Sequence, residues 1–185
     1  MARFFHYFAY GTDMHPLQPG LRNLGCTVLG PAYLVRHSLR FHRRSAVPTD
    51  GSGKCNAFHT GRASDVVHGV LYQIHEQHRG RLADLHPEDG GRRIGTVRVA
   101  LGPDTTEAAI HVADPDWIDD TLLPYDWYVA VIGSAARIHG LPTAYQARLR
   151  KVTSVADGDR ERSARYFEMA QGSRKIRAFF RAPRA

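Results

Sequence analysis

Hydrophobic and polar positions divide the chain into a strand-rich first part and a helical last part. Residues 4–10 are aromatic and apolar on both faces, which is typical of a strand buried inside a sheet. Strands that come early and helices that come late favour an α+β fold over a regular βαβ repeat. We predict strands at 4–10, 26–31, 33–41, 66–74, 93–101 and 107–113, and helices at 17–24, 79–85, 124–139 and 143–151.

Turn residues mark the boundaries between these elements. The run Pro48-Thr49-Asp50-Gly51-Ser52-Gly53 is the strongest loop signal, and Gly30-Pro31 predicts a turn that ends the second strand. The acidic segment 86–91 predicts a turn after a short helix. The last segment, 157–185, mixes aromatic and basic residues, and either a helix packed on the core or a tethered arm fits this pattern.

The net charge of +7 changes this picture little, because it is confined to one end of the chain. Residues 148–185 carry eleven basic and four acidic side chains, whereas the preceding residues are balanced. A nucleic-acid partner is therefore disfavoured. The 185 residues fit one domain, and no apolar run approaches the ~18 residues of a membrane span. We expect a cytoplasmic protein with no membrane partner.

Metal, redox and nucleotide chemistry find no support in the sequence. Cys26 and Cys55 are the only cysteines, and neither a disulfide framework nor a zinc site is indicated. The eleven histidines form no ligand set with sensible spacing, so no metal is expected. Ser134 lacks a G-x-S-x-G elbow, and glycine-rich phosphate-binding motifs are absent, so no nucleotide cofactor is expected.

Two segments could support chemistry. The loop Tyr10-Gly11-Thr12-Asp13-Met14 follows a buried strand, and its exposed amides could bind an anion such as a carboxylate. The pair Glu88-Asp89 precedes two glycines, and a carboxyl group in a partly apolar pocket could act in proton transfer.

The order of these features resembles that of the γ-glutamylcyclotransferase-like family, which includes AIG2-like and butirosin-type proteins. The family motif F-A-Y-G-S-N-M is matched by residues 8–14, and V-x-G-V-L-Y by residues 67–72. A leucine followed by D-x-x-E-G corresponds to residues 85–90. Tyr128, Gly133 and the run Gly140-Leu141-Pro142-Thr143-Ala144-Tyr145 follow the order of the last motif. The resemblance covers residues 4–152.

This resemblance implies a small mixed β-barrel flanked by α-helices, with a cavity at the strand ends. It implies a domain at 1–152, followed by a basic, helical C-terminal extension at 153–185. Members cleave a γ-glutamyl amide by intramolecular aminolysis, which forms 5-oxoproline and releases an amine or amino acid. The substrate is a small molecule, no metal or cofactor is required, and a homodimer is compatible with the sequence.

The resemblance also implies roles for individual residues. The motif's glutamate, which shuttles a proton, falls on Asp89, with Glu88 one position earlier as the alternative. Residues Tyr10, Gly11, Thr12, Asp13 and Met14 would bind the substrate, and Tyr145 would line the site.

One departure from the motif leaves other functions open. Asp13 replaces an asparagine, and its charge would repel a carboxylate. A more cationic, amine-bearing substrate is therefore one alternative. The D-x-x-E-G motif is also degraded here, which leaves a further alternative: a non-catalytic module that binds a small ligand, with its basic tail docked on an acidic partner.

Overall fold

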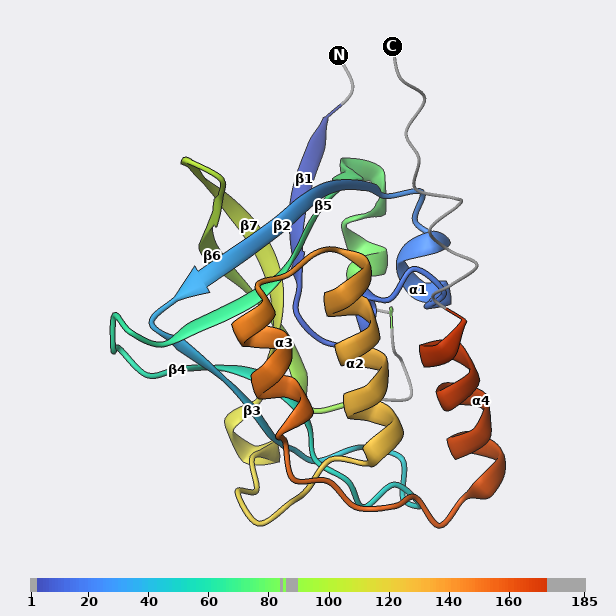
Figure 1. Cartoon of the computed structure of the whole chain (residues 1–185). Helices are drawn as coiled ribbons and strands as arrows, with labels where there is room; N and C mark the ends of the chain where they lie inside the picture. Colours follow the sequence, from blue (N-terminus) through green and yellow to red (C-terminus); the bar gives the residue numbers. More distant parts are fainter. Residues whose placement is uncertain (1–2, 84, 86–89, 173–185) are drawn as a thin grey trace.

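The computed structural model describes residues 3–83, 85 and 90–172. Seven strands come before the three longer helices, in the order that the hydrophobic pattern predicts (Figure 1). The strands are β1 (Phe4–Ala9), β2 (Thr27–Val35), β3 (His37–Arg43), β4 (Lys54–His59), β5 (Val66–His75), β6 (Arg92–Leu101) and β7 (Asp104–Ala113). The helices are α1 (Pro19–Arg22), α2 (Asp126–Ile138), α3 (Thr143–Arg150) and α4 (Arg160–Gln171), and the 3-10 turns are η1 (Thr12–Met14), η2 (Glu76–His78), η3 (Gly80–Leu82) and η4 (Pro115–Trp117).

Five strands close into a barrel in the order β1-β5-β2-β6-β7. Antiparallel pairs join its neighbours except at the closure, where β1 and β7 run parallel and pair Tyr7 with Ala109. The remaining strands, β3 and β4, form a separate two-stranded ribbon. The prediction of an α+β fold built on a small mixed barrel is therefore confirmed.

The predicted turn at Gly30-Pro31 is wrong, because β2 continues through it. A β-bulge between Val28 and Gly30 shifts the register against β5 and keeps the strand paired. Pro31 lacks a backbone N–H, but it is tolerated because β2 pairs with β6 only through Tyr33 and Ala100. The strand ends instead at Val35, and the chain turns at Arg36, whose φ is 63°.

The strand β4 was not predicted from the sequence. Its buried positions include Lys54 and Asn56, which break the usual alternation of apolar inward and polar outward residues. Both side chains are satisfied by hydrogen bonds: Lys54 donates to Asp50, and the Asn56 carbonyl accepts from the backbone of Ala113. Because their polar groups are paired, the strand can bury them.

Figure 1 shows α3, α2 and α4 side by side against the barrel. Helix α2 lies between the other two and buries one face, from Trp127 to Ala136. Helix α4 begins at Arg160, directly after the N-cap residue Asp159, whose carboxylate accepts a hydrogen bond from the amide of Arg162. It packs on α2 through stacking of Tyr166 on Trp127, with ring centroids 4.2 Å apart, and a 2.8 Å hydrogen bond from Ser134 Oγ to the carbonyl of Ala170. Up to Gln171, the C-terminal segment is therefore a helix packed on the core.

None of the described helices is both long enough and apolar enough to cross a bilayer.

Candidate active site

The loop after β1 is fixed by its contacts with two other elements. In η1, Met14 is completely buried, and its carbonyl accepts hydrogen bonds from Tyr72 Oη at 3.3 Å and His139 Nε2 at 2.8 Å. Tyr72 comes from β5, and His139 ends α2. The backbone of residues 11–14 is thus held between the barrel and α2, which pre-organises it for binding.

The side chain of Asp13 is held by a buried chain of hydrogen bonds. Tyr7 Oη donates to Asp13 Oδ2 at 2.9 Å, and His111 Nδ1 lies 3.1 Å from the same hydroxyl. Burial and the Asp13 carboxylate raise the pKa of Tyr7 well above its usual value, so the hydroxyl keeps its proton. Since that one proton goes to Asp13, Nδ1 of His111 acts as the donor to Tyr7.

These residues line a small polar cavity at the ends of β1 and β7. The described residues enclose about 30 Å³, close to the space of one water molecule. Two guanidinium groups, from Arg43 and Arg92, lie on its wall with the carboxylate of Asp13. The cavity is lined by Tyr7, Tyr10, Gly11, Thr12, Asp13, Arg43, Cys55, Arg92, His111, Val112, Ala113 and Tyr128. Opposite charges therefore face one small space, as binding of a zwitterionic group requires.

A second, larger cavity of about 250 Å³ adjoins the first. Thr12, Arg92 and Tyr128 line both. A ligand in the larger cavity can therefore direct a charged end toward the smaller one.

The thiol of Cys55 lies on the wall of the polar cavity but is not prepared for nucleophilic attack. Its Sγ lies 3.1 Å from Tyr128 Oη, and Cys55 N donates to the same oxygen at 3.3 Å. Burial raises the pKa of the Cys55 thiol, so the reactive thiolate is disfavoured. Burial likewise raises the pKa of Tyr128 well above its usual range. Both groups stay neutral at pH 7.

The predicted acid pair, Glu88 and Asp89, lies outside the described residues. The next residue, Gly90, is tied to the site because its carbonyl accepts a 2.8 Å hydrogen bond from Arg43 Nη1. Gly91 has a φ of +73°, and a Cβ there would lie 2.3 Å from the ring of Trp117. Only glycine fits this position, because a side chain at residue 91 would collide with Trp117.

A second hydrogen-bonded chain joins the β3–β4 ribbon to β7. His42 is buried, with Nδ1 2.7 Å from Asp120 Oδ1 and Nε2 3.0 Å from Asn56 Nδ2. Asn56 Oδ1 in turn accepts from Ala113 N at 2.9 Å. Because Arg43 and Cys55 are adjacent in sequence to His42 and Asn56, this chain fixes the cavity wall that they supply.

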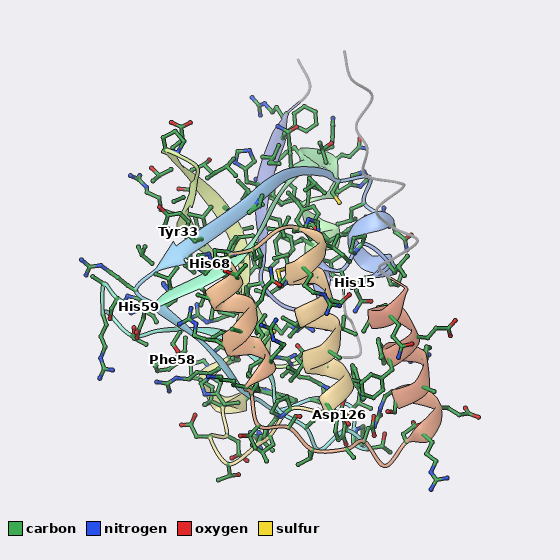
Figure 2. All side chains as sticks on the ribbon, viewed as in Figure 1. His15, Tyr33, Phe58, His59, His68 and Asp126 are labelled. Carbon is green, nitrogen blue, oxygen red and sulfur yellow. The ribbon has the colours of Figure 1, made fainter. Side chains whose placement is uncertain are left out.

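Of the six residues predicted to bind the substrate, the structure brings four to the polar cavity. Tyr10, Gly11, Thr12 and Asp13 line the polar cavity, whereas Met14 is a core residue that contributes its carbonyl to the loop anchor. Tyr145 lies on α3 in the core; its ring packs on His68 at 4.9 Å, and it lines neither of the two joined cavities. Figure 2 labels His68 beside Tyr33, close to α3.

Eight of the twelve residues that line the polar cavity were not predicted as site residues, and four of these eight supply its charged and hydrogen-bonding groups beside the loop: Tyr7, Arg43, Arg92 and His111. Tyr7 is one aromatic residue in an aromatic run, and 22 of the 25 basic residues are arginine, so these residue types carried no signal. Among the described residues, no group of three His, Cys, Asp or Glu side chains could hold a metal ion.

We predict that Gly11→Ala lowers the catalytic efficiency, kcat/KM, at least tenfold. A Cβ on Gly11 would lie 2.5 Å from Cys55 Sγ, and its φ of −109° is open to any residue, so the obstacle is space alone. The double variant Gly11→Ala/Cys55→Ala, which removes the sulfur, is expected to recover most of the loss. Steady-state kinetics of the two single variants and the double variant test this; absence of recovery would contradict the steric explanation.

The fold is shared with solved structures. The sequence matches no family model, and no curated protein is similar to it. An uncharacterized human protein aligns at TM-score 0.74 with 21% identity, over 89% of this chain and 98% of its own. A structure described as gamma-glutamyl cyclotransferase gives 0.75 and 21% over 90% and 99%, and YkqA from Bacillus subtilis gives 0.68 and 18% over 83% and 56%. The chain therefore has the γ-glutamylcyclotransferase-like fold that the sequence motifs imply.

Proposed function

We propose that this protein is a γ-glutamyl cyclotransferase, which converts a γ-glutamyl amide to 5-oxoproline and a free amine. The observation that carries the proposal is the polar cavity after β1, where the Asp13 carboxylate and two guanidinium groups face one small space. The γ-glutamyl group carries the matching charges, an α-ammonium and an α-carboxylate. The shared fold supports the same reading.

The reaction needs no nucleophile from the protein. The substrate's α-amine nitrogen attacks its own γ-carbonyl carbon, forming the ring C–N bond, and the bond to the leaving nitrogen breaks. The α-ammonium loses two protons, one before the attack and one as the ring forms; one of them passes to the leaving nitrogen, and the other is released to solvent. Ring closure already has the advantage of proximity, so the protein must orient the substrate and move protons. A neutral Cys55 thiol is compatible with this chemistry.

The cavity residues divide these tasks. Arg43 and Arg92 hold the α-carboxylate by charge-assisted hydrogen bonds, and Asp13 holds the α-ammonium and accepts its proton. Tyr7, held by His111, keeps the Asp13 carboxylate oriented. Asp89, or Glu88 one position earlier, transfers the proton that the leaving nitrogen gains. Arg43 holds the carbonyl of Gly90, the residue that follows this pair.

The test is direct detection of 5-oxoproline. Purified protein is incubated with a panel of γ-glutamyl amines, amino acids and dipeptides, and the product is followed by mass spectrometry. We expect product from the wild type and loss of at least a hundredfold in either Asp89→Asn or Glu88→Gln. No product from any panel member would refute the proposal and leave a ligand-binding module as the remaining reading.

The buried carboxylate of Asp13 favours a second candidate, the same reaction on a substrate with an additional amine. The second amine of a γ-glutamyl diamine would lie in the larger cavity, and the Asp13 carboxylate in the adjoining small cavity would attract it. Preference for such substrates over γ-glutamyl amino acids, lost in Asp13→Asn, would support it. Equal preference in the wild type and the variant would exclude it.

A further inference from the structure

The larger cavity has an aromatic wall and a basic rim. It lies between the start of β4, α2 and α4, which are far apart in the sequence. Trp127 and Tyr128 from α2 and Tyr166 from α4 supply the aromatic surface. The cavity of about 250 Å³ has the space of about eight water molecules, which suits an amino-acid-sized group.

Most of the charges around this cavity are paired. Lys54 Nζ lies 2.6 Å from Asp50 Oδ2 and 2.9 Å from Ser52 Oγ. Arg162 makes two hydrogen bonds to the carboxylate of Asp157, at 2.6 and 2.7 Å. These charges are part of the cavity wall and are already neutralised by their partners, so they do not provide a binding site for a ligand's charge.

Arg165 differs from these groups. It lies on the exposed side of α4, lines the cavity, and forms no ion pair with any residue in the described part of the chain. Its guanidinium carbon stands 5.0 Å from the ring centre of Tyr166, so the aromatic ring keeps it at the cavity rim. An arginine held at a rim without a carboxylate partner is suited to bind an anionic group of a ligand.

We propose that this cavity is the subsite for the leaving group, and that Arg165 selects leaving amines that carry a carboxylate beside an apolar or aromatic side chain. This inference rests on the proposed function. The charged end of the glutamyl group points toward the small cavity, which has room for only part of it, and the scissile amide lies near Thr12, Arg92 and Tyr128, which line both spaces. The amine released on ring closure then lies against Trp127 and Tyr166.

The experiment compares two substrates that differ in one charge, γ-glutamyl-phenylalanine and γ-glutamyl-phenylalaninamide. We expect the wild type to prefer the carboxylate by about fivefold in kcat/KM, the size of a partly exposed ion pair. Arg165→Gln should bring the ratio close to one, mainly by lowering kcat/KM for the carboxylate. Arg160→Gln, an exposed arginine of the same helix that does not line the cavity, should keep the wild-type ratio.

Two other results would separate the inference from the proposed function. If 5-oxoproline forms from both substrates with equal kcat/KM, or if Arg165→Gln keeps the preference, the subsite is refuted while the cyclotransferase activity stands. If neither substrate yields 5-oxoproline, the activity fails, and calorimetric binding of the same two compounds decides the subsite. Tighter binding of the carboxylate that is lost in Arg165→Gln would uphold it, and equal binding would refute it.

Discussion

Asp13→Asn is expected to lower kcat/KM for γ-glutamyl amides about thirtyfold. The amide keeps an oxygen that can accept the 2.9 Å hydrogen bond from Tyr7, so the loop conformation is retained. In the proposed function, the variant loses the charge that holds the α-ammonium and takes its proton, and hydrogen bonds to charged groups are about twice as strong as neutral ones. Steady-state kinetics with 5-oxoproline detection measure the loss.

A glutaryl amide provides the matched control for this effect, because it lacks the α-amine. It can bind but cannot cyclise, and its inhibition constant should not rise in Asp13→Asn; it should stay the same or fall, because the Asp13 charge repels the carboxylate of this compound. Tyr7→Phe, which removes the hydroxyl that orients the carboxylate, should give a smaller loss with the true substrate. If the inhibition constant of the glutaryl amide rises as much as kcat/KM falls, Asp13 is structural and the assigned role is wrong.

Asp157→Asn is expected to destabilise the protein by about 2 kcal/mol at pH 7. The Asp157 carboxylate accepts hydrogen bonds from Arg162, from Trp127 Nε1 at 2.7 Å and from the amide of Asp159, and its side chain is 0% exposed. The bonds from Arg162 lower the pKa of Asp157 from its usual value to about 2. A shift of this size corresponds to about 2 kcal/mol of stability.

The sign of the pH dependence follows from the direction of that shift. The folded-state pKa is depressed, so the stabilisation is present above the unfolded pKa of about 4 and is lost as pH falls from about 4 to 2. Urea unfolding at pH 7, 5 and 3 should therefore show a difference between wild type and Asp157→Asn that narrows at pH 3. Asp104→Asn, in the exposed β6–β7 turn, should follow the wild type. A difference that stays constant with pH would contradict the ionic origin.

The sequence predicts the architecture and the loop of the site, but not the charges that complete the cavity. Residues 10–14 stand out because an apolar strand stops at a glycine, which is a local pattern. No sequence pattern identifies Arg43 or His111 as site residues. They come together only in the folded protein, Arg43 from the β3–β4 ribbon and His111 from the end of β7. Contacts between residues so far apart in sequence depend on strand order and register, which periodicity does not specify.

The sequence does not predict the larger cavity, and the reason is a different one. The basic composition of residues 148–185 predicts a charged segment without a defined place, and Tyr166 is one aromatic residue among arginines. Its position is set by stacking on Trp127, a residue near the start of α2, and by the buried pair of Asp157 and Arg162. These are tertiary interactions, so the sequence left both a packed helix and a tethered arm open.

The closure of the barrel by β1 and β7 has a consequence for how the protein forms during synthesis. The strand that begins the chain pairs with β5 and then, in parallel, with the last strand of the barrel. While the chain emerges from the ribosome, the edge of β1 stays open until residue 113 has been made, and such long-range pairing is slow. The loop after β1 is therefore made well before the strand that encloses it, which exposes nascent chains to misassociation through the open edge of β1.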